Sequence, residues 1–209
     1  MKRTALLVGA TGLTGQALLS CLLADERYQQ VLAPVRTQPS WQHAKLHWLA
    51  INPPMETPVT DFFCTLGTTR KQAGRAGLAA VDRDLVVQFA QQAKALGAQR
   101  ACILSAIGAN AQSPFLYNRL KGQMQQQVAA IGFERLVFMQ PSVLLGQRSQ
   151  HRGLEHLAGK LLAHPGWGRY QAMPATQVAS AMWRSLTDAA PGEFYFEVQD
   201  IQQLNKEGL

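Results

Sequence analysis

A tyrosine and a lysine four residues apart form a pattern suited to proton transfer. Tyr117 and Lys121 share one face of a helix expected over about 114–130, because residues i and i+4 are neighbours on a helix. An ammonium beside a phenol stabilises the phenolate and lowers the tyrosine pKa from about 10. Such a phenol donates a proton to a carbonyl oxygen as hydride arrives, and Ser105 supplies a hydroxyl that polarises the carbonyl. The alternatives are a chance helical pair and a serine that closes a strand.

A glycine-rich run near the N-terminus is suited to binding an anion. Gly9, Gly12 and Gly15 follow the apolar stretch 5–8 and precede a helical stretch over 16–23. Glycine lets the backbone turn tightly and approach an anion, and a helix N-terminus directs free N–H groups and partial positive charge toward it. We expect the pyrophosphate of a dinucleotide there; the alternative is an ordinary turn between a strand and a helix.

Arg36 occupies the position that selects between the two nicotinamide dinucleotides. Folds that bind NAD place an acidic residue about twenty residues beyond the glycines, where it accepts hydrogen bonds from the adenine ribose. Here the strand ends in Pro34-Val35-Arg36, and Asp25 and Glu26 come before the strand. A guanidinium binds a 2′-phosphate with two charge-assisted hydrogen bonds, so the sequence favours NADP(H) over NAD(H). The alternative is a surface arginine.

Length and composition indicate one globular domain with a full core. The chain has 209 residues, of which 47% are hydrophobic and 16% charged. The net charge is +7 and the pI is about 9.7, but the basic residues are scattered, so we expect a small anionic ligand and no nucleic acid. The five histidines show no spacing typical of metal ligands, so no metal site is expected.

The cysteines and the N-terminus indicate a cytoplasmic protein. Cys21, Cys64 and Cys102 are odd in number and widely separated, which predicts reduced core residues. Lys2-Arg3 and the uncharged stretch 4–24 resemble a secretion signal, but cleavage would remove the first strand and the glycine run. We therefore expect these residues to be part of the fold, and we expect no membrane-spanning segment.

The elements that must position these residues alternate between strand and helix. Strands are expected over about 4–9, 30–35, 45–50, 59–66, 100–105 and 133–139, with helices over about 13–24, 78–96 and 114–130 and a polar loop over 67–77. This alternation predicts an α/β fold with a Rossmann-like, doubly wound parallel sheet and ligands at the carboxyl ends of the strands.

The alternation of strands and helices becomes less regular after Pro141. Helices are expected over about 154–163 and 175–189, with a strand over about 193–198 and a short final helix. We interpret the chain as a single NAD(P)-binding domain over 1–209, with a core over about 1–145 and a small C-terminal lobe over about 146–209 on the substrate side.

Four stretches carry a more specific pattern than the glycines. They are Cys64 to Gly74, which contains Leu-Gly-Thr-Thr-Arg, and then Val81 to Val86, Phe115 to Gly122 and Gln140 to Leu145. Together with the Gly-x-x-Gly-x-x-Gly spacing they resemble the Tat-interacting-protein oxidoreductase family, which are atypical short-chain dehydrogenases/reductases. The resemblance covers nearly the whole chain.

The resemblance implies that NADP(H) binds on a Rossmann fold. The residues that it implies at the pyrophosphate are Gly9, Thr11, Gly12, Leu13, Thr14 and Gly15, and it places Arg36 at the 2′-phosphate. It implies Leu66 and Gly67 beside the adenosine half, Tyr117 and Lys121 at the nicotinamide ribose, Val143 and Leu144 near the carboxamide, and Arg152 in a loop over the cofactor.

Three residues concern catalysis in the wider superfamily. Ser105 matches the catalytic hydroxyl, and Ala106 stands where some relatives have a second serine. Asp82 falls where an asparagine is common, which puts a proton relay through that asparagine in doubt. The sequence therefore predicts an NADPH-dependent reductase of an unidentified carbonyl-type substrate. The alternative is a non-catalytic NADP(H)-binding regulatory or assembly protein, and a protein partner or a homo-oligomer stays open.

Overall fold

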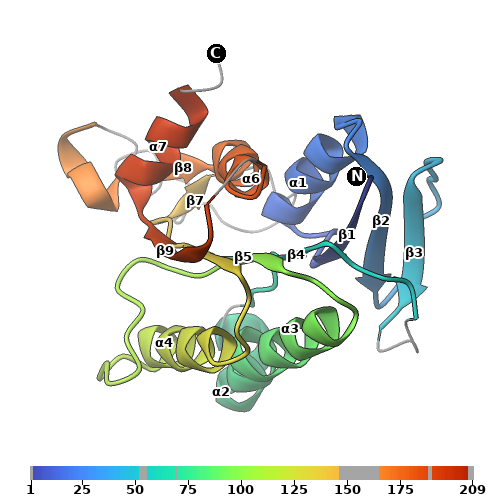
Figure 1. Ribbon diagram of the computed structural model, residues 1–209. Coiled ribbons are helices and arrows are strands. Elements are labelled where there is room, and N and C mark those ends of the chain that lie inside the picture. The colour runs from blue at the N-terminus through green and yellow to red at the C-terminus, as the bar shows by residue number, and fades with distance from the viewer. Residues whose placement is uncertain (1, 52–55, 69, 146–164, 188–189, 207–209) are drawn as a thin grey trace.

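Seven strands form one sheet in which every neighbouring pair is parallel (Figure 1). The computed structural model describes residues 2–51, 56–68, 70–145, 165–187 and 190–206. In spatial order the strands are β3 (Leu46–Ala50), β2 (Tyr28–Val35), β1 (Arg3–Val8), β4 (Asp61–Cys64), β5 (Arg100–Leu104), β6 (Arg135–Met139) and β9 (Gly192–Phe196). The order changes direction between β1 and β4, which confirms the predicted doubly wound α/β fold and places ligands at the carboxyl ends of the strands there.

Helices cover both faces of the sheet, and each face has its own apolar core (Figure 1). On one face lie α2 (Arg70–Ala79), α3 (Val86–Ala95) and α4 (Leu116–Ala129); on the other lie α1 (Leu13–Ala24) and α6 (Ala175–Arg184). The central strands are buried on both sides, which explains why they read as continuous apolar runs rather than as alternating ones.

The described part of the C-terminal tail extends the main sheet. β9 pairs with β6 along its whole length, α6 packs against α1, and α7 (Val198–Lys206) follows β9. β7 (Leu144–Leu145) and β8 (Met173–Pro174) form a small second sheet, and a 3₁₀ segment covers Pro165–Tyr170. The helix expected over 154–163 lies outside the described residues, and the lobe boundary at residue 146 stays a prediction.

Two expected elements differ from the structure between β4 and β5. The stretch 67–77, expected to be a polar loop, contains α2, which bends at Gly74 with φ +66°. The helix expected over 78–96 divides into a π-helical segment, Ala80–Leu85, and α3. Glycine lowers helix propensity, which made this stretch look irregular, but tertiary context overrides propensity.

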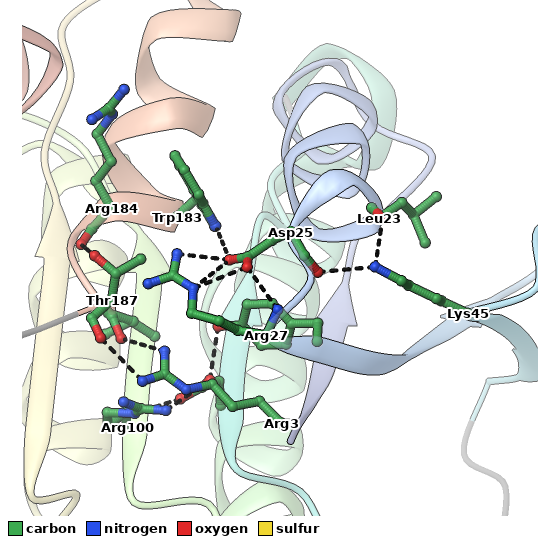
Figure 2. Close-up of polar contacts among 12 residues, drawn as sticks. Arg3, Leu23, Asp25, Arg27, Lys45, Arg100, Trp183, Arg184 and Thr187 are labelled. Atoms are coloured by element: carbon green, nitrogen blue, oxygen red, sulfur yellow. Dashed lines mark hydrogen bonds and ion pairs between the residues drawn. The ribbon is translucent and has the colours of Figure 1, made fainter. Parts of the chain in front are cut away.

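An aspartate and two arginines link the amino ends of the strands (Figure 2). Asp61, fully buried, accepts hydrogen bonds from Arg100 at 2.6 and 2.9 Å and from the Tyr28 hydroxyl at 2.7 Å. Arg3 donates to the carbonyls of Leu186 and Thr187 just beyond α6, at 3.4 and 3.1 Å. The bonds of Asp61 join β2, β4 and β5, and those of Arg3 join β1 to the end of α6.

A second group of polar contacts joins the ends of α1 and α6 (Figure 2). Asp25, directly after α1, pairs with Arg27 at 2.8 Å and accepts a hydrogen bond from the Trp183 indole of α6 at 2.8 Å. Lys45 donates to the carbonyls of Leu23 and Asp25 at 3.0 and 2.9 Å. Burial raises the pKa of Asp25, but the bonds from Arg27 and Trp183 outweigh it and lower the pKa to about 2.

Candidate functional site

The glycine run forms a tight turn between β1 and α1 that excludes side chains. Gly9 has φ +89°, and a Cβ there would lie 2.7 Å from the Thr65 Oγ1. A Cβ on Gly15 would lie only 2.0 Å from the carbonyl oxygen of Gly9. Thr65 holds the turn through hydrogen bonds from its hydroxyl to the carbonyls of Val8 and Gly9, at 3.2 and 3.1 Å. Only glycine permits this close passage of the strand, the turn and the helix.

The N-terminus of α1 leaves polar groups free at this turn. The first hydrogen bond within α1 runs from the Gln16 N–H to the Gly12 carbonyl, and no side chain caps the helix. The amides of Leu13, Thr14 and Gly15 therefore have no partner within the helix. The Thr14 hydroxyl is buried and has no hydrogen-bond partner among the described residues. Free amides, an orphaned hydroxyl and no acidic residue in the first turn fit a bound pyrophosphate.

Arg36 follows the carboxyl end of β2, the strand beside β1. Its side chain is exposed and makes no hydrogen bond or ion pair with any residue that the structure describes. A free guanidinium beside the glycine turn is available to an anion. Its assignment to a 2′-phosphate stays a prediction.

Lys121 is a buried cation on α4. It is 1% exposed, its Nζ lies 2.9 Å from the Asp82 Oδ1, and it donates to the Leu104 carbonyl at the end of β5 at 3.3 Å. Burial lowers the pKa of Lys121, but Tyr117 and Asp82 outweigh it and raise the pKa above its usual value. The lysine therefore remains an ammonium beside the end of β5.

The predicted lowering of the Tyr117 pKa is wrong for this structure. Tyr117 precedes Lys121 by one helical turn, and its side chain is 40% exposed. Desolvation raises the pKa of Tyr117, Lys121 lowers it and Asp82 raises it again, so that the net shift is upward. The sequence-based prediction considered the ammonium alone, whereas desolvation of the phenol outweighs the ammonium and the Asp82 carboxylate adds to the upward shift.

Ser105 lies just beyond β5 and is almost fully buried. Its hydroxyl accepts a hydrogen bond of 2.7 Å from the amide of Gln125, which lies on α4 one turn beyond Lys121. Because Gln125 donates, the hydroxyl keeps its own proton for another acceptor. This geometry suits a donor to a carbonyl oxygen, and the catalytic role of Ser105 stays a prediction.

The remaining predicted site residues lie at the same edge of the sheet or outside the description. Leu66 and Gly67 follow β4, and Val143 and Leu144 follow β6, where Val143 is 43% exposed. Thr11 is exposed in the glycine turn. Arg152 lies outside the described residues.

A polar depression of about 460 Å³ lies at the carboxyl ends of β6 and β9. Leu104 pairs with Met139 and Met139 with Phe196, so the next residues, Ser105, Gln140 and Glu197, continue one row across the sheet. Gln140 and Glu197 line the depression with Arg169, Tyr195, Gln199 and Asp200. The Gln140 residue is 8% exposed, and its side-chain amide has no hydrogen-bond partner among the described residues.

Two residues of this site were given no role from the sequence, Gln125 behind Ser105 and Gln140 in the depression. Asp82 was noted only because it stands where an asparagine is common, and its pairing with Lys121 was not predicted. Gln125 is spaced four residues from Lys121 and eight from Tyr117, a periodicity that places all three on one helix face. That periodicity could have identified Gln125. No local signal identifies Gln140 or the pairing of Asp82 with Lys121, because both depend on tertiary contacts.

The cysteines are free thiols. Cys64 and Cys102 are buried, and burial raises their pKa values to about 11 and about 12. Among the described residues no group of histidines, cysteines and acidic residues could hold a metal ion. Within the same residues, no helix has the length and apolar composition needed to cross a bilayer.

Comparison with known proteins identifies relatives along nearly the whole chain. Protein HTATIP2 of Rattus norvegicus is 31% identical over 98% of this chain and 90% of its own length. Protein FMP52 of Eremothecium gossypii is 38% identical over 81% of this chain and 80% of its own length. FMP52-1 of Scheffersomyces stipitis is 30% identical over 97% of this chain and 99% of its own length. No protein-family model matches the chain.

Solved structures with the same fold bind nicotinamide dinucleotides. MoeE5 in complex with UDP-glucose and NAD superimposes with a TM-score of 0.69 over 98% of this chain and 81% of its own, at 12% identity. The Bordetella bronchiseptica enzyme WbmG in complex with NAD superimposes with a TM-score of 0.67 over 100% of this chain and 79% of its own, at 15% identity. At these identities the likeness establishes the fold alone.

The comparisons overturn the predicted cytoplasmic location. Three fungal relatives, from Scheffersomyces stipitis, Eremothecium gossypii and Emericella nidulans, are named as mitochondrial proteins. The prediction rested on reduced cysteines, which a mitochondrial protein can also have, so the cysteine pattern did not separate the two compartments.

Proposed function

The chain belongs to the family of HTATIP2 and FMP52, which are atypical short-chain dehydrogenases/reductases with an NAD(P)-binding fold, and from this premise we propose that it is an NADPH-dependent reductase of a carbonyl-type substrate. The observation that carries the proposal is the buried ammonium of Lys121 at the end of β5, on the same helix face as Tyr117 and within a turn of the residue that binds Ser105. A buried ion pair seldom gives a net gain in stability, so an ammonium kept at this edge of the sheet supports a role toward a ligand.

NADP(H) rather than NAD(H) is proposed because of the charges around the glycine turn. The turn and the end of β2 present Arg36 and no acidic residue, so a 2′-phosphate would meet a cation and no repulsion. The proposed pyrophosphate contacts are the glycine turn and the first amides of α1, including the Thr14 hydroxyl. Leu66, Gly67, Val143, Leu144 and Arg152 keep their proposed places along the cofactor.

In the proposed mechanism the chain supplies a proton and orients the carbonyl. When bound, the reduced nicotinamide supplies hydride to the carbonyl carbon. Ser105, oriented by Gln125, donates a hydrogen bond to the carbonyl oxygen. Tyr117 transfers its phenolic proton to the same oxygen, and solvent restores that proton. Lys121 bonds the ribose hydroxyls and stabilises the phenolate while it exists.

Two measurements test the proposal. NADPH is expected to raise the melting temperature of the purified protein more than NADH at the same concentration. A panel of carbonyl compounds is then screened by the loss of NADPH absorbance, and Tyr117→Phe is expected to lower the turnover of any active compound by at least about a hundredfold. Arg119→Gln, on the same helix, is the matched control. Full activity of Tyr117→Phe overturns the proposed acid, and binding without turnover overturns the reductase assignment in favour of a binding protein.

A further inference from the structure

Asp82 connects two parts of the proposed site with one carboxylate. It is fully buried, and its Oδ2 accepts a hydrogen bond of 2.9 Å from the N–H of Thr68, in the loop that follows β4. Its Oδ1 lies 2.9 Å from the Nζ of Lys121. A Cβ placed on Gly67 would lie 3.6 Å from the same Oδ1, so the backbone of the loop passes directly over the carboxylate.

The π-helical segment Ala80–Leu85 separates Asp82 from the charges beside it in the sequence. Arg83 and Asp84 pair with each other at 2.7 Å and remain partly or largely exposed, at 28% and 55% of their side chains. Asp82 alone of this Asp-Arg-Asp run faces inward. Segments of π-helix are frequent at functional sites, because the wider turn changes which side chains face the protein.

The charges around Lys121 come from three elements. Tyr117 is on its own helix, Asp82 is on the π-helical segment, and the thiol of Cys64 faces it from β4. Burial raises the pKa of that thiol to about 11, so it is neutral at physiological pH. Asp82 is therefore the counter-ion of Lys121. A lone ammonium stabilises a neighbouring phenolate, whereas an ammonium paired with a carboxylate presents little net charge to the phenol.

We propose that Asp82 is a positioning residue that offsets the charge of Lys121 and thereby adds to the desolvation that keeps Tyr117 protonated, so that near neutral pH the site favours proton donation in reduction over proton acceptance in oxidation. The inference rests on the proposed function and adds a direction to it. In reduction the carbonyl carbon gains hydride, the carbonyl oxygen takes the phenolic proton, and the phenolate left behind is reprotonated from solvent. In the reverse direction Tyr117 must first lose its proton, and the negative charge of Asp82 opposes that loss.

The experiment measures the ionisation of Tyr117 directly and needs no substrate. The chain has four tyrosines, so labelling with carbon-13 at the ring Cζ gives four signals, and Tyr117→Phe identifies the one that belongs to Tyr117. This signal is titrated in the wild type, in Asp82→Asn, in Lys121→Met and in the double variant Asp82→Asn/Lys121→Met. Asp84→Asn is the matched control, because it removes the same charge from the surface of the same segment.

The expected order of the Tyr117 titrations follows from the charge that each variant leaves in the site. Asp82→Asn leaves a net positive charge and moves the titration to lower pH, and Lys121→Met leaves a net negative charge and moves it to higher pH. The double variant leaves no charge and returns the titration toward that of the wild type. Asp84→Asn leaves it in place. With an active substrate, the rate of reduction falls at high pH as Tyr117 loses its proton. Asp82→Asn moves this fall to lower pH, which the loss of a merely structural residue would not do.

A Tyr117 titration that is the same in Asp82→Asn as in the wild type overturns the inference. If Asp82→Asn does not fold, the comparison of Lys121→Met with the double variant decides. Tyr117 must then titrate at higher pH in Lys121→Met than in the double variant. NADPH binding is measured on the same samples. Absence of binding to the wild type refutes the proposed function, whereas normal binding with an unmoved titration refutes only the role of Asp82.

Discussion

The two ends of the sheet treat their polar groups in opposite ways. At the amino end, Asp61, Arg100, Tyr28 and Arg3 are bonded to one another or to the carbonyls beyond α6 (Figure 2). At the carboxyl end, the Thr14 hydroxyl, the Arg36 guanidinium and the Gln140 amide find no partner among the described residues. At the amino end these polar groups satisfy each other, whereas at the carboxyl end three polar groups are left available to a ligand beside bonded ones such as Lys121 and Asp82.

This difference separates stability from function along one axis of the molecule. Buried polar groups cost free energy unless they are hydrogen-bonded, so a buried unbonded group such as the Thr14 hydroxyl marks a place where a ligand or a water can complete it. Substitutions at the amino end should therefore change the unfolding of the free protein and leave its response to NADPH intact. Substitutions at the carboxyl end should do the reverse. Each prediction below tests one side of this division.

Asp61→Ala should have the largest effect, and it should fall on stability alone. It leaves the Tyr28 hydroxyl and the Arg100 guanidinium without their acceptor, which costs about 3–5 kcal/mol when a buried ion pair loses one partner. Urea unfolding followed by tryptophan fluorescence measures the loss. Asp61→Asn keeps an acceptor and should lose less. The division fails if the folded variant has lost the NADPH-induced rise in melting temperature.

Arg36→Glu should act at the other end, on the cofactor alone. Replacing the guanidinium with a carboxylate removes charge-assisted bonds to the proposed 2′-phosphate and adds repulsion, about 2 kcal/mol or thirtyfold in NADPH affinity. Affinity for NADH should change little, and the unfolding free energy should stay within about 0.5 kcal/mol, because Arg36 bonds no described residue. Calorimetry measures both nucleotides. Lys206→Glu makes the same charge change on α7, and an equal loss there would remove Arg36 from the site.

How far the sequence specified this site depends on the length scale of each contact. The glycine run and the Tyr117–Lys121 spacing are local patterns, and the structure places them at one edge of the predicted sheet. The pairing of Asp82 with Lys121 joins residues far apart in the sequence and depends on a π-helical turn, which a period of 3.6 residues does not reveal. The expected pKa of Tyr117 was wrong for a similar reason: desolvation of the phenol, the largest cause of its upward shift, and the added effect of Asp82 both arise from tertiary packing.

Asp25→Asn should weaken the amino end in a pH-dependent way. The folded-state pKa of Asp25 is about 2, below its usual value of 3.8, so its contribution to stability is complete above the unfolded pKa and is lost as the pH falls through the folded pKa. The shift corresponds to about 1–2 kcal/mol after allowance for the exposure of Arg27, which is 37%. The stability difference between wild type and variant should be constant above about pH 5 and disappear toward pH 2.

Urea unfolding over that pH range measures the Asp25 contribution, with Asp84→Asn as an exposed control. A difference between wild type and Asp25→Asn that does not shrink in acid would mean that the carboxylate charge is not what holds the ends of α1 and α6 together. NADPH binding at neutral pH should be unchanged.

Thr14→Val should give the smallest effect and the sharpest test, because its two consequences have opposite signs. The Thr14 hydroxyl is buried without a partner, so removing it should stabilise the free protein by about 1 kcal/mol while weakening NADPH binding by a similar amount. Thr65→Val is the matched control: its hydroxyl bonds the Val8 and Gly9 carbonyls, so that variant should lose stability. If Thr14→Val instead destabilises the free protein and binds NADPH normally, the hydroxyl serves the fold, and the carboxyl end is not the ligand-completed end.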